Sequence, residues 1–163
     1  MTTIQQVFEH NADFFLADES TIFAKDLIQT SATNDYKKNI LSGSCSSTKS
    51  AFMEEVAAKF TFPSYFGKNW DALLDSLNET LWCLPGCSQY MLVFTEADSL
   101  LSQEADIEIS NLFEILKASI DALSGSDRNL QLKVVFLLKQ VRDSRLEKAM
   151  ADQGLRYQML VAA

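Results

Sequence analysis

Two apolar runs on either side of a long amphipathic segment constrain the fold more than any other feature of this sequence. The runs at 90–95 and 132–138 have the length and composition of buried strands. Between them, apolar residues recur at helical spacing along one face: Ile109, Leu112, Phe113, Leu116, Ile120 and Leu123. This stripe predicts a core-facing helix that ends at Gly125. Strands separated by a helix require a crossover, so we expect an α/β fold with a mostly parallel sheet packed by helices.

A third core strand and another helix precede these elements. We expect the strand over 38–41, closed by a turn at 42–44. The helix should begin after the N-cap Ser47 and stop before Pro63, because proline disfavours helical backbone in the residue before it. Its apolar residues recur at four-residue steps on one face: Phe52, Val56 and Phe60.

The two ends of the chain add shorter elements to this core. At the N-terminal end, we expect a strand over 12–16 and a helix over 21–30 with Ser20 as its N-cap. At the C-terminal end, we expect a helix over 144–153 and a strand over 157–161. Both short strands are predicted at the edges of the sheet.

No repeat, low-complexity tract or linker divides the chain, which contains only 5 glycines and 2 prolines. We therefore expect a single domain over 1–163, with a core at about 38–138 and extensions at 1–37 and 139–163. The C-terminal extension is richer in basic residues than the rest, and it could cover a sheet edge or make a dimer contact. A monomer or a weak dimer is the expectation.

Acidic side chains outnumber basic ones, with 22 Asp and Glu against 14 Lys and Arg and a formal net charge of -8. This balance disfavours direct binding to nucleic acid, because phosphates attract positive charge. It favours a basic protein as partner, since opposite charges speed association. We find no signal-peptide pattern and no apolar stretch of the roughly 18 residues that cross a membrane. Together with an odd number of cysteines, this predicts a cytoplasmic protein with reduced thiols.

A further helix, expected over 69–82, has two distinct faces. At about 100° per residue its apolar residues fall on the core side. They are Trp70, Leu73, Leu74, Leu77 and Leu81. Asp71, Asp75 and Asn78 share another face. A first-turn acid such as Asp71 complements the helix dipole, and Asp75 could simply be solvent-exposed, so the residues alone leave a structural and a binding role open.

The segment 60–78, FTFPSYFGKNWDALLDSLN, resembles the signature of the barstar family of ribonuclease inhibitors. The pattern is a proline, an aromatic pair and then G-x-N-(aromatic or aliphatic)-D-A-L-x-D-x-L. It is matched by Pro63, Tyr65, Phe66, Gly67, Asn69, Asp71, Ala72, Leu73, Asp75 and Leu77. The resemblance extends through the order of elements from about 38 to 138. It implies a small parallel sheet packed by helices, with three core strands and extra edge strands here.

The resemblance implies a protein that binds a basic ribonuclease and blocks its active site. Asp75 would then occupy the site of an RNA phosphate, and Asp71 would accept charge-assisted hydrogen bonds nearby. Tyr65 would offer a rigid aromatic surface. The other residues implied at the contact are Phe66, Gly67, Asn69, Leu74, Asn78 and Glu114.

Several of these positions carry more specific expectations. Gly67 would shape the loop through a positive φ, and Asn69 would bond to the partner's backbone. Leu74 and Asn78 depart from the best-known member, which has an aromatic residue and a hydroxyl residue there. Glu114 is the nearest candidate for a supporting acid on the helix that ends at Gly125. It belongs to a stretch (96–114) that contains six acids and no base. These departures leave an alternative: an interaction module for another toxin or a regulatory protein.

Nothing in the sequence supports catalysis, a metal or a cofactor. His10 is the one histidine, which is too few for a His-based metal cluster. The Cys83-x-x-x-Cys87 spacing fits neither a CxxC redox site nor a zinc site, and no glycine-rich phosphate-binding motif occurs. The hypothesis that Asp71 and Asp75 form a catalytic pair is the weaker one, because both residues would lie on an exposed helix face without a pocket. We therefore expect no enzymatic activity and no cofactor.

Overall fold

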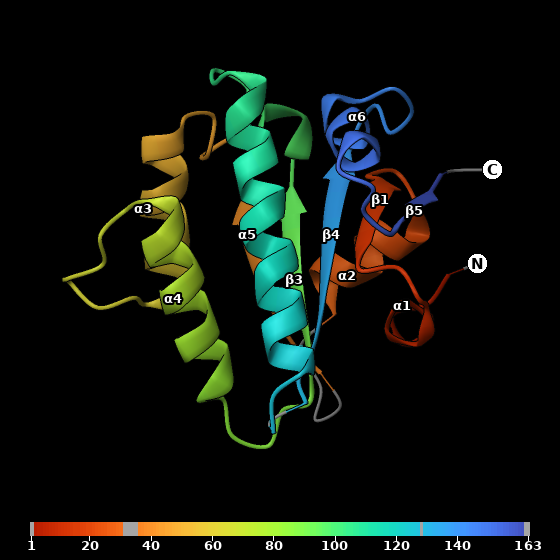
Figure 1. The fold of residues 1–163 in the computed structure, drawn as a ribbon. Coiled ribbons are helices and arrows are strands. Elements are labelled where there is room, and N and C mark those ends of the chain that lie inside the picture. The colour runs from red at the N-terminus through yellow and green to blue at the C-terminus, as the bar shows by residue number, and fades with distance from the viewer. Residues whose placement is uncertain (1, 31–35, 128, 162–163) are drawn as a thin grey trace.

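The computed structural model describes residues 2–30, 36–127 and 129–161 and shows a parallel sheet covered by helices (Figure 1). Its five strands lie in the order β2-β3-β4-β1-β5. They are β1 (Phe14–Asp18), β2 (Lys37–Ser42), β3 (Gln89–Thr95), β4 (Gln131–Leu138) and β5 (Tyr157–Leu160). The helices are α1 (Ile4–Glu9), α2 (Ile22–Gln29), α3 (Lys49–Phe60), α4 (Trp70–Trp82), α5 (Asp106–Ser124) and α6 (Arg145–Asp152), with a 3₁₀ turn η1 (Ala97–Ser99). The predicted α/β fold and the three core strands are confirmed.

The strand predicted at the N-terminal edge of the sheet lies inside it instead. β1 pairs in parallel with β4 on one side and with β5 on the other, so that Phe14 lies opposite both Val134 and Tyr157. The expectation of an edge strand over 12–16 is therefore wrong in its position. The physical reason is that residues 14–17 are apolar and buried on both faces, which an interior strand of a covered sheet requires. β5 does form an edge, as predicted.

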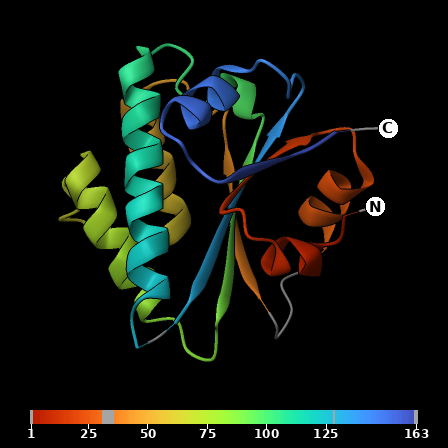
Figure 2. The same ribbon diagram turned by 45° about the vertical axis from the view of Figure 1, so that its right-hand side comes forward.

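The direction of the crossovers divides the helices between the two faces. The connection from β1 returns across the sheet to β2, whereas all later connections run the opposite way. Right-handed crossovers then put α2 on one face and α3 to α6 on the other, which Figure 2 shows. Alternate residues of β4 follow this division: Val134 and Phe136 pack on the α3–α6 side, and Val135 packs on the side of α1 and α2. No helix in the described part of the chain is long and apolar enough to span a membrane.

Two helices begin one residue later than predicted. Thr21 rather than Ser20 caps α2, and Thr48 rather than Ser47 caps α3. The Ser20 hydroxyl instead donates a hydrogen bond of 2.6 Å to the carboxylate of Asp18, which holds the turn after β1. Such local bonds compete with capping.

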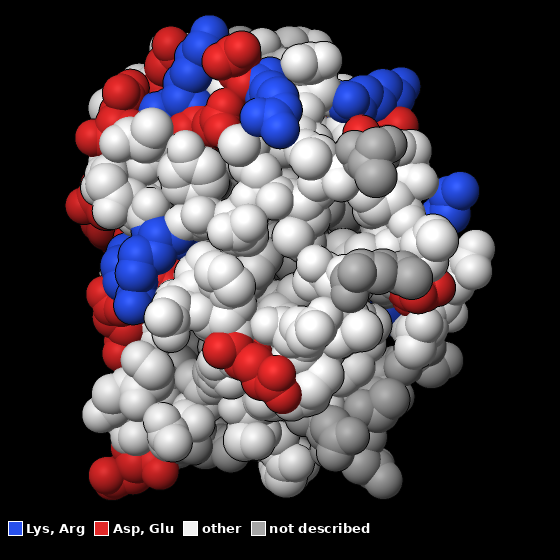
Figure 3. Space-filling model, turned by 90° about the vertical axis from the view of Figure 1, so that its right-hand side faces the viewer, with Lys and Arg blue, Asp and Glu red and all other residues white. Residues whose placement is uncertain are grey.

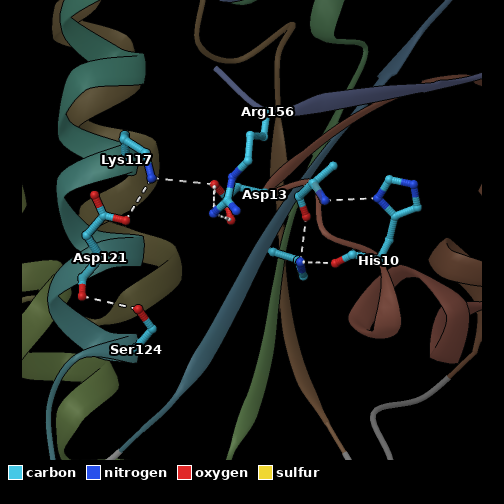
Figure 4. A network of polar contacts seen from close by, with 8 residues as sticks. His10, Asp13, Lys117, Asp121, Ser124 and Arg156 are labelled. Carbon is cyan, nitrogen blue, oxygen red and sulfur yellow. Dashed lines mark hydrogen bonds and ion pairs between the residues drawn. The ribbon is translucent and has the colours of Figure 1, made fainter. Parts of the chain in front are cut away.

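Buried charged groups attach both extensions to the core (Figure 4). Asp13, just before β1, is 5% exposed, and its carboxylate lies 3.1 Å from Nη2 of Arg156 and 3.6 Å from Nζ of Lys117. Lys133 on β4 is 4% exposed and donates to the backbone oxygens of His10 and Ala12. Burial lowers the pKa of Lys133, and the nearby Asp13 carboxylate partly opposes this effect.

Candidate protein-binding surface

The loop between α3 and α4 separates its adjacent aromatic residues Tyr65 and Phe66, exposing the first and burying the second. Phe62 stacks on Phe60, with ring centroids 5.7 Å apart, and it contacts the tilted ring of Phe66 at 5.0 Å. Phe66 is 7% exposed and belongs to the core, whereas Tyr65 is 80% exposed. The structure therefore places Tyr65 on the surface as expected, and it places Phe66 beneath that surface as the support of the loop.

Asn69 fixes the junction between this loop and α4. Its Oδ1 accepts a hydrogen bond of 2.8 Å from the Ala72 N–H as the N-cap, and its Nδ2 donates to the Gly67 carbonyl at 3.3 Å. The amide therefore makes two hydrogen bonds within the chain, and the bond to a partner's backbone that the resemblance implies stays a prediction. Its position sets the direction in which α4 starts.

Gly67 does not have the positive φ that the sequence suggested. The left-handed residue is the next one, Lys68, with φ 53°, and its ammonium lies 2.5 Å from Glu54. A Cβ at 67 would lie 3.3 Å from both the Ala72 Cβ and the Asn69 Nδ2, a tight contact that a shift of a few tenths of an ångström would relieve. The close approach of loop and helix, rather than the φ, favours a small residue at this position.

The two acids of α4 are exposed on the same helix face. Among the described residues, no side chain or backbone group makes a hydrogen bond or ion pair with the carboxylate of Asp71 or of Asp75. Residues four apart on a helix lie about 5–6 Å from each other at Cβ, so the two carboxylates form a compact negative pair. A pair of exposed carboxylates at this spacing can accept hydrogen bonds from cationic side chains of a partner.

The two positions that depart from the best-known barstar are partly buried. Leu74 packs against the main core cluster. Asn78 is tied to α5, because Ser119 donates a hydrogen bond of 2.5 Å to its Oδ1. Both residues border the face of Asp75, but neither projects freely from it.

The structure brings Glu114 of α5 beside the start of α4. Glu114 and Asn111 line one side of a shallow hollow of 350 Å³, and Trp70 and Asp71 line the other. Four of the six acids in the stretch 96–114 are bonded within the chain: Asp98, Glu104, Asp106 and Glu108. The Glu114 carboxylate has no such bond to a described residue, so it can add to the negative pair on α4.

Sequence reasoning missed the contribution of Glu108. The indole Nε1 of Trp70 donates to Glu108 Oε2 at 3.2 Å, and these residues are 38 positions apart in the chain. The sequence predicts Trp70 on the core face, and Trp70 is partly buried against that core. The available signal was its indole N–H, which needs an acceptor when it is buried.

The described residues offer no group of three or more His, Cys, Asp or Glu side chains suited to a metal ion. Cys45, Cys83 and Cys87 are free thiols, of which Cys87 is buried. The side of the molecule opposite α4, where α1 and β5 lie, has a largely uncharged centre (Figure 3).

Two solved structures of ORC proteins are similar in fold or partly similar to this one. The ORC2 protein of Aeropyrum pernix, solved as complexes with ADPNP and ADP, has a TM-score of 0.53 at 11% identity. The match covers 93% of this chain, but this chain spans only 42% of the length of that protein. A structure of Drosophila ORC bound to DNA has a TM-score of 0.47 at 11% identity, covering 97% of this chain and 85% of that one. The first likeness shows the fold alone.

Comparison with curated protein sequences gives no match. A family model does match: the one described as Barstar (barnase inhibitor) covers residues 37–137. This range contains β2, β3 and all but the last residue of β4, together with α3, α4 and α5, and it includes the loop and the carboxylate pair described above. The chain therefore belongs to the barstar family.

Proposed function

We propose that this protein inhibits a basic ribonuclease by inserting the loop 61–69 and the N-terminal half of α4 into its active-site cleft. Asp75 takes the place of an RNA phosphate, and Asp71 accepts hydrogen bonds from a second cationic group. Tyr65 covers the rim of the cleft. The inhibition is steric and electrostatic and requires no chemistry in this chain.

One observation carries the proposal: the two acids of α4 are exposed together and are not neutralised by the described residues. Asp71 and Asp75 lie within the family segment, directly after a loop that presents Tyr65 at 80% exposure. Unpaired carboxylates repel each other by a few tenths of a kcal/mol at this spacing, so Asp75, which lies beyond the first turn, adds no stability to the free chain through Asp71. Cations of a partner would remove that repulsion on binding.

The net charge supports the same partner. At -8 the chain attracts a basic protein over long range, and the rate of association should fall as salt is added. Arginine suits the carboxylates best, because its planar guanidinium can donate two parallel hydrogen bonds to one carboxylate.

Binding to purified barnase, measured by calorimetry and by inhibition of RNA cleavage, tests the proposal. Replacing Asp75 with Asn should weaken binding by about tenfold or more while the unfolding midpoint stays unchanged. Asp26→Asn is the matched control, because Asp26 is an exposed acid on α2, across the sheet from α4. Equal binding by the Asp75 and Asp26 variants would remove α4 from the contact.

The altered surroundings of Asp75 favour one alternative, which is a different protein partner for the same surface. Leu74 packs against the core, and Asn78 accepts a hydrogen bond from Ser119. The surface around Asp75 therefore differs from that of the best-known member, which has other residues at these two positions. If the wild-type chain binds no basic ribonuclease, capture from the native host followed by mass spectrometry should recover that partner. Loss of the recovered protein with Asp75→Asn would then assign it to the α4 surface.

A further inference from the structure

We propose that Glu108 is the positioning residue of the binding surface: it holds Trp70, and through Trp70 it fixes where the carboxylates of α4 point. This inference rests on the proposed function, since it concerns the same surface. Glu108 itself lies on α5, and its side chain is 19% exposed.

Trp70 is the first residue of α4, so its side chain anchors the turn that carries Asp71. The indole packs against Phe52 of α3, with ring centroids 5.8 Å apart. Its Nε1 donates to Glu108 Oε2 at 3.2 Å. The ring is therefore fixed on one side by packing and on the other by a charge-assisted hydrogen bond.

Lys49 completes the arrangement from a third helix. Its Nζ lies 3.5 Å from Glu108 Oε2 and 5.5 Å from the centroid of the Trp70 ring. Asn111 donates to the other oxygen, Oε1, at 3.2 Å. Both oxygens of Glu108 are thus used, and one carboxylate joins α3, α4 and α5.

This network lies at the edge of the surface that Asp71, Asp75 and Glu114 form, which gives the network a role beyond stability. Lys49, Trp70 and Asn111 line the same hollow as Asp71 and Glu114. Lys49 balances the charge of Glu108, so Glu108 can lie near the exposed acids Asp71 and Glu114 with little repulsion. A partner then meets carboxylates already in place, and little ordering remains to be done on binding.

The binding test compares Glu108→Gln with Asp106→Asn. Both changes remove one acid from the first turn of α5, but Asp106 pairs with Arg145 and is 89% exposed. Glu108→Gln should raise the dissociation rate of the barnase complex by about two- to tenfold. Asp106→Asn should alter only the association rate, through net charge.

A double-mutant cycle and Trp70 fluorescence separate positioning from general stability. Trp70→Phe removes the indole donor and keeps a ring, so it should raise the dissociation rate as much as Glu108→Gln does, with no further rise in the double variant. With Trp82→Phe as background, Trp70 is the one tryptophan, and Glu108→Gln should increase its quenching by iodide. Unchanged quenching, or additive effects on dissociation, would overturn the positioning role. Failure of the wild-type chain to bind barnase would instead count against the proposed function, and the quenching result would still decide whether Glu108 holds Trp70.

Discussion

Ser119 of α5 donates a hydrogen bond of 2.5 Å to the Oδ1 of Asn78 on α4, and the hydroxyl is fully buried. Replacing Ser119 with Ala leaves the half-buried amide without its donor. We expect a loss of about 1–2 kcal/mol in the free energy of unfolding, measured with urea. Ser50→Ala, at an exposed site on α3, should cost nothing and is the control. Equal midpoints for the two variants would show that the hydrogen bond contributes no stability.

Gly43 and Gly154 should respond very differently to alanine. A Cβ at Gly43 would lie 2.2 Å from the backbone oxygen of Glu96, so the ends of β2 and β3 would have to separate. We expect a loss of about 3 kcal/mol or more in unfolding free energy. Gly154 has φ 65° and open space around it, so alanine there should cost only about 1–2 kcal/mol of backbone strain. Thermal unfolding of both variants checks the ranking, which a similar loss at the two sites would contradict.

Tyr90 makes the fold sensitive to alkaline pH. Burial raises the pKa of its hydroxyl to about 12. A hydrogen bond with the Asn39 side chain opposes this rise, and the charge of a Cys87 thiolate adds to it. In the unfolded chain a tyrosine ionises near pH 10, so above this pH the unfolded state loses its proton first. The free energy of unfolding should therefore fall between about pH 10 and pH 12, by about 3 kcal/mol in all.

Urea unfolding across this pH range measures the effect, and Tyr90→Phe is the test variant. Because phenylalanine does not ionise, the decline should become shallower in the variant. Burial also raises the pKa of Tyr36, so some slope should remain. Superimposable pH profiles for the two proteins would rule out a contribution from Tyr90.

Lys133 should be essential for holding the N-terminal segment against the sheet. Methionine has a similar length but cannot donate, so Lys133→Met leaves the carbonyls of His10 and Ala12 without this partner. We expect a loss of about 2–3 kcal/mol, together with faster hydrogen exchange in α1. Lys139→Met, at an exposed site, is the control. Unchanged exchange in α1 would mean that packing alone holds this segment.

The elements with strong periodicity were predictable because their pattern follows from the fold. The stripe on α5 packs against one face of the sheet, and the apolar runs of β3 and β4 are buried on both faces. The place of β1 was not predictable in this way. A short apolar run suits an edge or an interior strand, and only its pairing with β4 and β5 decides between them.

The binding surface shows the same division. The spacing of Asp71 and Asp75 was enough to put both on one exposed face of α4. Tyr65 and Phe66 are adjacent aromatics, and the loop conformation alone decides that the second is buried. The role of Glu108 depends on a contact across 38 residues, which no local pattern can reveal.

The insertion of β1 beside β4 also determines how the molecule can be handled. It brings α1 and β5, the first and last elements, to the side of the sheet away from α4 (Figures 1 and 2). A tag or a fused reporter at either terminus would therefore point away from Tyr65 and the acids of α4. Anchored to a sensor chip by either end, the protein would present that surface to the solution, ready to capture its ligand.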